Sequence, residues 1–253
     1  MSVVVTGAAG GIGAELVRQL SEQGERVWAV DRAWPGELAT SGPEDSVRRL
    51  TADVTDARSV TEAVEAIRAE GEPVIGLVNA AGIVLARPLL QTTPEGWEQV
   101  FAVNARGVFL MTQAVLGLMI EQSPEDPRRR RGIVTVSSNA GRVPRAEFGA
   151  YGASKAAATS VTHSFGLQAA AHGIRCNVVS PGTTRTPMIT ETWAGEDRTA
   201  QTVAGAPESF RLGIPLGRIA EPEDIVAAVM FLLSERARHV TLQDLTVDGG
   251  ATL

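Results

Sequence analysis

The fold is decided near the amino terminus, by Val3-Val-Val-Thr-Gly7-Ala-Ala-Gly-Gly11-Ile12-Gly13. An apolar run of strand type leads into closely spaced glycines, and an amphipathic helical pattern begins directly behind them. Gly7 permits a tight turn, Gly11 lets a ligand approach the backbone, and Gly13 allows helix and strand to pack closely. The helix amino terminus then faces this loop. The stretch therefore predicts a site for a dinucleotide pyrophosphate, with Ile12 among the cofactor-binding residues.

The rest of the chain alternates short apolar runs with longer segments of helical period. The runs that predict strands are Val3–Val5, Val27–Val30, Val74–Val78, Ile133–Val136, Ile174–Val179 and Leu242–Val247, and a further strand is expected before Asp53. Unbroken apolar strands separated by amphipathic helices are typical of a parallel sheet that is buried on both faces. The sequence therefore predicts one α/β domain over residues 1–253, a doubly wound Rossmann fold with a mostly or wholly parallel sheet and helices on both faces.

Composition limits the partners and the compartment. The chain has 253 residues, a net charge of -6 and a single cysteine, Cys176. The acidic balance argues against nucleic acid or an anionic membrane surface as partner, and no histidine spacing indicates a metal. The first strand begins almost at Met1, and the longest apolar run, Ile225–Leu233, is too short to span a bilayer. We expect a cytoplasmic protein, in which Arg128–Arg131 belongs to a solvated loop.

Two helical segments carry unusually little charge, Trp97–Ile120 and Ala150–Ala171. A helix that is apolar or small-sided all round needs a second partner, which is often another subunit. A deeply buried central helix is the alternative explanation. The pattern favours a homo-oligomer without excluding that alternative.

Three further segments bear on the cofactor. Asp31 closes the second predicted strand, where its carboxylate can accept hydrogen bonds from the adenosine ribose and would repel a 2′-phosphate. NAD is therefore expected over NADP, although Arg32 offers a group that can hold a phosphate. Asp53-Val54 follows the third strand and can meet adenine, and the small residues of Asn79-Ala80-Ala-Gly82 leave space for the cofactor. Either segment alone is also compatible with ordinary loop chemistry.

Tyr151 and Lys155 stand four residues apart and hence on one face of a helix. Free tyrosine has a pKa of about 10, so a neighbouring positive charge is needed to favour the phenolate near neutral pH. Such a pair also arises by chance on protein surfaces. Its meaning depends on the other residues that accompany it.

The complete set of motifs resembles the short-chain dehydrogenase/reductase family over essentially the whole chain. The matching elements are Thr6-Gly7-x-x-x-Gly11-Ile12-Gly13, Asn79-Ala-Ala-Gly82, Asn104, Ser138, Tyr151-x-x-x-Lys155 and Pro181-Gly182. The resemblance implies that Tyr151 is the general base, that Lys155 lowers its pKa and binds the nicotinamide ribose, and that Ser138 holds the substrate oxygen. It also implies a proton relay supported by Asn104, and cofactor contacts from Pro181, Gly182 and Thr184. A non-catalytic dinucleotide-binding protein on the same fold is the competing hypothesis.

Within that family, three segments are similar to the 2,3-dihydro-2,3-dihydroxybenzoate dehydrogenases of siderophore-type biosynthesis. They are Arg175–Gly182, Leu212–Gly217 and His239–Leu253. The similarity implies NAD-dependent oxidation of a ring alcohol, followed by tautomerisation to an aromatic phenol, by a homotetramer.

The substrate of such an enzyme carries a carboxylate, for which Arg145 is the candidate binding group. A solvent-facing loop arginine is the alternative explanation for that residue. Glu147, Phe148 and the segment Arg185-Thr-Pro187 depart from the pattern of these dehydrogenases. Glu147 can pair with an ammonium group, so the second candidate substrate is 2,3-dihydro-3-hydroxyanthranilate, whose oxidation gives 3-hydroxyanthranilate in secondary metabolism.

The segment 183–210 follows Pro181-Gly182 and is expected to form a lid over nicotinamide and substrate. Met188 and Trp193 are its candidate substrate-binding residues. Trp193 can equally be a packing residue that anchors the lid.

Overall fold

The computed structural model describes residues 1–35, 43, 46–123 and 131–252, and it contains one seven-stranded sheet in the order β3-β2-β1-β4-β5-β6-β7. Every neighbouring pair of strands is parallel. The strands are β1 (Ser2–Thr6), β2 (Arg26–Asp31), β3 (Val47–Thr51), β4 (Val74–Asn79), β5 (Arg131–Val136), β6 (Ile174–Pro181) and β7 (Asp244–Val247). The predicted doubly wound parallel sheet is confirmed.

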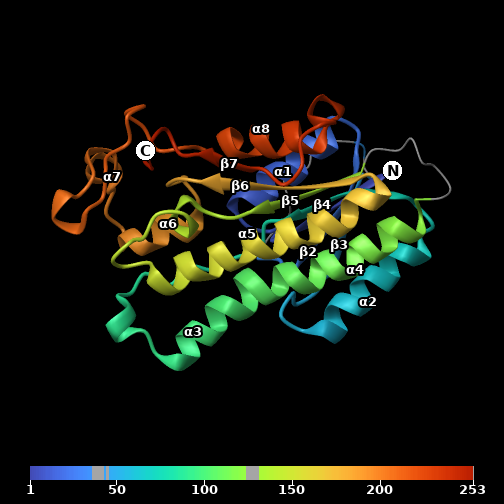
Figure 1. Ribbon diagram of the computed structural model, residues 1–253, viewed down its shortest axis with the longest axis horizontal. Helices are drawn as coiled ribbons and strands as arrows, with labels where there is room; N and C mark the ends of the chain where they lie inside the picture. Colours follow the sequence, from blue (N-terminus) through green and yellow to red (C-terminus); the bar gives the residue numbers. More distant parts are fainter. Residues whose placement is uncertain (36–42, 44–45, 124–130, 253) are drawn as a thin grey trace.

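Helices cover both faces of the sheet (Figure 1). On one face lie α1 (Gly11–Glu22) and α8 (Pro222–Leu233), and on the other lie α2 (Ala57–Ala69), α4 (Val108–Glu121) and α5 (Gly149–Ala169). Each face has its own apolar core. The strand order reverses between β1 and β4, so a crevice opens at the carboxyl edge of these strands, where ligands bind in open α/β sheets.

Shorter elements gather around that carboxyl edge. The helix α3 (Pro94–Phe101) continues through the π-helix η2 (Ala102–Gly107) into α4, while α6 (Pro187–Thr190) and α7 (Thr199–Ala204) lie together at one end of the molecule (Figure 1). The 3-10 turns are η1 (Leu89–Gln91), η3 (Asn139–Gly141), η4 (Ala170–His172), η5 (Glu191–Trp193), η6 (Pro207–Ser209) and η7 (Glu235–Ala237).

The strand before Asp53 is β3, at the edge of the sheet. Its arginines, Arg48 and Arg49, are exposed, because an edge strand of this sheet is not covered on both faces. No apolar run marks it in the sequence, since the rule of unbroken apolar strands applies to the centre of a parallel sheet. The predicted start of the last strand at Leu242 was wrong: Leu242 has a left-handed backbone with φ 59°, and β7 begins at Asp244.

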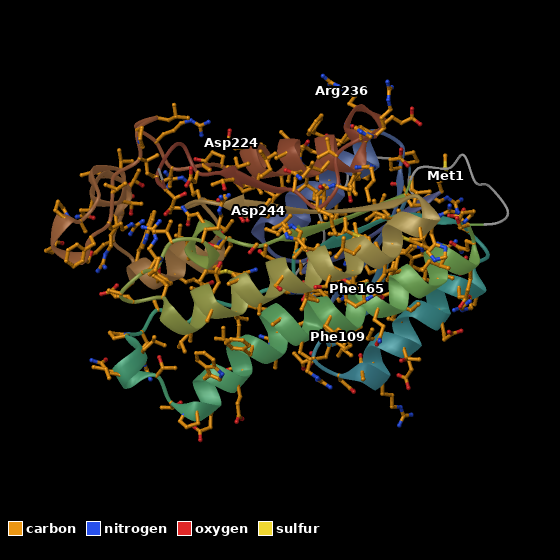
Figure 2. All side chains as sticks on the ribbon, viewed as in Figure 1. Met1, Phe109, Phe165, Asp224, Arg236 and Asp244 are labelled. Atoms are coloured by element: carbon orange, nitrogen blue, oxygen red, sulfur yellow. The ribbon has the colours of Figure 1, made fainter. Side chains whose placement is uncertain are left out.

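The two helices of low charge pack against each other. The rings of Phe109 on α4 and Phe165 on α5 are stacked with centroids 5.9 Å apart. Figure 2 labels both side chains. On the outer side, Phe109 and Leu167 remain 39% and 70% exposed. The sheet therefore covers one side of this helix pair, and the outer side keeps apolar groups in contact with solvent.

By length and composition alone, the helical run Pro94–Glu121 is able to cross a membrane. Half of its most apolar 18-residue stretch is buried inside the protein, and core helices of soluble proteins can be equally long and apolar. It packs here against the sheet and α5, so it is a core helix.

The structure bears on two further predictions, one for Arg128–Arg131 and one for Cys176. Arg131 begins β5 and is 1% exposed, and its Nη2 donates to the Gln122 carbonyl oxygen over 2.9 Å, so the prediction of a solvated loop was wrong for Arg131. Arg128–Arg130 lie outside the described residues. Cys176 lies inside β6 as predicted, and burial raises the pKa of its thiol to about 12.

Candidate active site

The glycine loop joins β1 to α1 at the switch point of the sheet. Gly7 has φ +66°, and a Cβ there would lie 2.6 Å from the Ala81 amide nitrogen. A Cβ on Gly13 would overlap the Gly7 carbonyl oxygen. The helix α1 starts without a side-chain cap, so its first amide groups are free to face a ligand. The loop thus has the close packing and the open helix terminus expected of a phosphate site.

A cleft of about 460 Å³ extends from this loop along the carboxyl ends of β2, β3 and β4. Of the predicted cofactor residues, those lining it are Gly7, Gly11, Ile12, Gly13, Asp31, Asp53, Val54, Ala80 and Gly82. Its size and shape suit an extended ligand. An elongated dinucleotide therefore fits the residues that the structure brings together here.

Two carboxylates stand at one end of the cleft. Asp31 accepts hydrogen bonds from the Ala9 amide over 3.0 Å and from the Arg32 amide over 2.7 Å, which hold its carboxylate beside the glycine loop. Asp53 Oδ1 accepts from the amide and the hydroxyl of Thr55, and these bonds lower the pKa of Asp53. Asp53 is therefore ionised at neutral pH and rigidly placed.

Six predicted cofactor residues lie outside the lining of the cleft: Asn79, Tyr151, Lys155, Pro181, Gly182 and Thr184. The buried Asn79 Nδ2 donates to the hydroxyls of Thr112 and Thr135, so this amide ties β4 to α4 and β5. Pro181 is the last residue of β6, and the buried Thr184 donates to the Gly182 carbonyl oxygen. Asn79, Pro181 and Thr184 are buried and do not line the cleft, whereas Gly182 and Tyr151 border a second cavity.

Four polar side chains converge beyond the other end of the cleft. Tyr151 and Lys155 occupy successive turns of α5, with Lys155 Nζ 5.9 Å from the centre of the Tyr151 ring. Ser138 lies two residues after the end of β5, at the start of η3, and is hydrogen-bonded to Tyr151. Burial raises the pKa of Tyr151, and the bond to Ser138 partly opposes that rise. Burial also lowers the pKa of Lys155 to about 8.

The fourth residue, Asn104, lies in the π-helix η2. Its amide donates to the Ile83 carbonyl oxygen and to the Ser154 hydroxyl, and its Oδ1 accepts from the Ile83 amide. A Cβ on Gly82 would lie 3.3 Å from both Asn104 Oδ1 and Lys155 Nζ. The absence of a side chain on Gly82 therefore leaves Asn104 and Lys155 close to one another. π-helical turns are frequent at functional sites, and this one carries a buried amide beside the lysine.

The second cavity, of about 320 Å³, opens beside Tyr151 and Ser138. Of the predicted substrate residues, Arg145, Glu147, Phe148 and Trp193 line it. Phe148 also packs edge-on against Tyr151, with ring centroids 6.2 Å apart. Met188 lies elsewhere, because it lines the dinucleotide cleft together with Thr186 and Pro187. The segment after β6 thus borders both cavities.

Sequence reasoning missed three residues of this region. Thr186 covers the glycine loop so closely that a Cβ on Gly11 would lie 2.5 Å from its methyl carbon. Glu208 and Arg211 line the second cavity, and Arg211 stands one residue beyond the predicted lid. No motif marks them. A general signal was present all the same, since charged residues in a long segment after a catalytic strand are candidates for binding.

Within the described ranges, no three of the side chains of His, Cys, Asp and Glu group in a way that could hold a metal ion.

Comparisons with known proteins agree with this arrangement. The family description that matches residues 7–252 is Enoyl-(Acyl carrier protein) reductase, which belongs to the short-chain dehydrogenases/reductases. The chain is 43% identical to 2,3-dihydro-2,3-dihydroxybenzoate dehydrogenase of Escherichia coli (strain K12) over 100% of this chain and 97% of that protein. For the enzyme of the same name from Bacillus subtilis (strain 168) the identity is 41%, over 98% and 95%.

A solved structure has the same fold. It is the 3-ketoacyl-(acyl-carrier-protein) reductase from Brucella melitensis complexed with NADH, at 28% identity and a TM-score of 0.85, with 100% of this chain and 98% of that chain covered.

Proposed function

The chain belongs to the short-chain dehydrogenase/reductase family, and from that premise we propose that it oxidises 2,3-dihydro-2,3-dihydroxybenzoate to 2,3-dihydroxybenzoate with NAD. It is an oxidoreductase that acts on a CH–OH group. The observation that carries the choice of substrate is a single small cavity lined by Ser138, Tyr151 and Arg145. A catalytic hydroxyl pair and a cation for a carboxylate then face the same bound ring.

NAD(H) is the cofactor, and the cleft accounts for its recognition. The glycine loop and the free amides of α1 would hold the pyrophosphate, Asp31 the adenosine ribose, and Asp53 with Val54 the adenine. When bound, NAD supplies an acceptor for a hydride. Asp31 would repel a 2′-phosphate, which supports NAD over NADP.

The polar residues that converge near Tyr151 would position the substrate hydroxyl and remove its proton. Ser138 would hold the substrate oxygen, and Tyr151 would take the hydroxyl proton as the ring carbon gives up its hydride. The ammonium of Lys155 lies near enough to stabilise the phenolate, and it would also hold the nicotinamide ribose. Asn104, close to Lys155, would support the route by which the proton leaves. The resulting ketone tautomerises to a phenol, and aromatisation makes the oxidation favourable.

The wider assignment follows from the same premise. We propose that Thr183 to Phe210 closes over nicotinamide and substrate, with Pro181, Gly182 and Thr184 supporting its base. The protein would work as a cytoplasmic homotetramer in siderophore-type biosynthesis, with the apolar outer side of α4 and α5 as one contact. A non-catalytic dinucleotide-binding protein would have no need of a tyrosine bonded to a serine beside a buried lysine.

A second substrate has one observation in its favour. Glu147 and Glu208 line the same cavity as the arginine, and a carboxylate there can pair with an ammonium group. That charge pattern supports 2,3-dihydro-3-hydroxyanthranilate. Glu147, however, also interacts electrostatically with Arg211, which offsets its charge. The identity to two dihydrodihydroxybenzoate dehydrogenases favours the diol.

The test is a direct substrate comparison. Purified protein is given NAD and either the diol or the amino compound, and the aromatic product is identified by mass. We expect a higher kcat/KM for the diol. A higher value for the amino compound would replace the first assignment with 3-hydroxyanthranilate formation, and Glu147→Gln would then be expected to lower turnover of the amino compound alone.

A further inference from the structure

Two arginines face the second cavity from separate parts of the chain. Arg145 lies in the loop between Ser138 and Tyr151. Arg211 lies just beyond Thr183 to Phe210, the proposed lid, hereafter the covering segment. Both side chains are half-buried, and both line the cavity of about 320 Å³ that Ser138 and Tyr151 also line. Glu147 and Glu208 line the same cavity, but the two arginines together with the catalytic hydroxyls suit it to a small anion that carries a reactive hydroxyl.

Neither arginine is neutralised by an ion pair in the part of the chain that the structure describes. Among the described residues, no carboxylate oxygen lies within 4 Å of either guanidinium, and Glu147 acts on Arg211 only through longer-range electrostatic attraction. The Arg211 guanidinium donates one hydrogen bond to the Thr183 hydroxyl over 3.1 Å. The other donors of the two forks are available to a ligand. Since one guanidinium offers five donors, two of them can surround both oxygens of a carboxylate.

The two charges also act on each other. Burial lowers the pKa of Arg145, and the positive charge of Arg211 lowers that pKa further. The negative charge of Asp248 partly opposes this lowering, and the Asp248 carboxylate already accepts hydrogen bonds from Asn139, Gly250 and Thr252. Two half-buried like charges cost free energy in the free protein. A bound anion would remove that cost. Its binding is therefore favoured by the loss of repulsion between the two arginines as well as by the new hydrogen bonds.

Backbone geometry holds Arg211 in place. Its amide donates to the Ala206 carbonyl oxygen over 3.0 Å, and the Ala206 amide donates back over 2.9 Å. Gly205, at φ +83°, permits this close approach, because a Cβ there would lie 2.8 Å from the Arg211 carbonyl oxygen. Phe210 has a left-handed φ of 56° and a ring that is 96% exposed. A bulky residue with that backbone is strained, and such strain collects at ligand-binding segments.

We propose that Arg211 is a second substrate-binding residue, which holds the ring carboxylate jointly with Arg145 and so links the covering segment to the catalytic loop through the substrate. This inference rests on the proposed function, since it takes the substrate to be a carboxylate. It predicts that an anionic ring alcohol is preferred over a neutral one.

The experiment compares two substrates in four variants. The substrates are 2,3-dihydro-2,3-dihydroxybenzoate and the corresponding cyclohexadiene diol without a carboxylate; the variants are Arg145→Gln, Arg211→Gln, the double variant and Arg198→Gln. Arg198 is the matched control, because it is exposed, lies in the same covering segment and pairs with Glu196. Loss of one charged hydrogen-bonding group, about 1.5–3 kcal/mol, corresponds to about a 10- to 150-fold rise in KM.

We expect each single substitution at Arg145 or Arg211 to raise KM for the carboxylate by about that factor and to leave KM for the neutral diol and kcat nearly unchanged. Because both residues hold one group, the double variant should lose less than the product of the two single effects. Arg198→Gln should match the wild type with both substrates. An unchanged KM in Arg211→Gln, an equal rise for both substrates, or strictly multiplicative losses would each overturn the shared clamp.

A separate readout distinguishes this proposal from the function on which it rests. If the wild-type protein oxidises neither diol, the proposed function fails. Binding of 2,3-dihydroxybenzoate to the NADH-saturated protein, measured by calorimetry, still tests the anion site. Weaker binding in Arg211→Gln than in Arg198→Gln supports the clamp, and equal binding, or no binding to the wild type, overturns it.

Discussion

The two cavities are built in different ways. The cleft beside Gly7 and Asp53 is made mainly of residues in the turns that follow β1 to β4, although Gln99 to Val103 and Thr186 to Met188 also border it. The cavity beside Tyr151 is made of side chains from three distant segments, and it gathers Arg145, Glu147 and Arg211 from loops. The first is fixed by the sheet and its turns. The second depends on how long connections pack over it.

This difference explains why the two parts divide recognition between them. A phosphate-containing cofactor common to a whole family can be held by amide groups and a helix terminus, which any sequence with the right glycines supplies. A particular substrate needs particular charged groups, and loops can change those groups without disturbing the sheet. Substitutions should therefore separate cofactor binding from substrate binding and chemistry.

The largest separation is expected from Tyr151→Phe. Removal of the phenolic oxygen takes away the base while the ring still fills its place against Phe148, so turnover should fall by about 10²- to 10⁴-fold with NADH affinity retained. The measurements are kcat with the diol and the NADH dissociation constant. Activity near the wild-type level would remove Tyr151 from the mechanism, and a parallel loss of NADH binding would join the two cavities into one unit.

A smaller effect is expected from Lys155→Met, measured through pH dependence. The active phenolate fraction grows as pH rises towards the pKa of Tyr151, which burial raises, so kcat/KM should increase with pH on the acid side. Lys155, with a pKa of about 8, is mostly charged at neutral pH, and in the proposed mechanism this charge stabilises the phenolate. Without it the rising limb should move upward by about 1–3 pH units. A limb that stays in place would show that Lys155 does not tune the tyrosine.

Gly13→Ala tests the other cavity. The new methyl group would overlap the Gly7 carbonyl oxygen, so the loop must shift, at a cost of about 1–3 kcal/mol and with weaker NADH binding. Gly117→Ala is the control, because that helical glycine has nothing within 4 Å of a new Cβ. Thermal unfolding and NADH titration measure both variants. If the two variants behave alike, close packing at Gly13 is not what shapes the cleft.

Asp31→Asn should have the smallest effect. Without the negative charge, repulsion of a 2′-phosphate falls, and the preference for NAD over NADP should shrink by about tenfold, in line with one surface-accessible charge interaction. The ratio of kcat/KM for the two cofactors measures it, with kcat for the diol as a check on the second cavity. Equal use of both cofactors by the wild-type protein would contradict the role of Asp31.

The same contrast governs what the sequence could predict. The parallel sheet, the glycine loop and the carboxylates after β2 and β3 follow from local patterns, because each pattern is completed within one strand, turn and helix. The edge strand β3 was not recognisable as an apolar run, since exposure on an edge frees Arg48 and Arg49 from the rule of burial. Arg131 appeared to belong to a solvated loop, but its long side chain reaches the Gln122 carbonyl oxygen from inside β5.

The substrate cavity was predictable only in outline. Arg145 was identified because it lies between Ser138 and Tyr151, where sequence distance limits spatial distance, and Glu147 because it departs from the pattern of the similar dehydrogenases. Arg211 lies 60 residues beyond Tyr151, and its approach depends on the turn at Gly205, which no motif encodes. Met188 was expected at the substrate and lies at the dinucleotide cleft instead. Packing of long connections decides such contacts, and periodicity does not describe it.

The central claim is that a ring alcohol bound in the second cavity gives a hydride to NAD bound in the cleft. It is tested most directly with 2,3-dihydro-2,3-dihydroxybenzoate that carries deuterium on both carbinol carbons. Mass analysis of cofactor and product should find one deuterium in the reduced cofactor for each molecule of 2,3-dihydroxybenzoate formed, and Tyr151→Phe should slow the appearance of both by about 10²- to 10⁴-fold without changing that ratio. An aromatic product that forms without deuterium in the cofactor, or no reduced cofactor at all, would contradict the account.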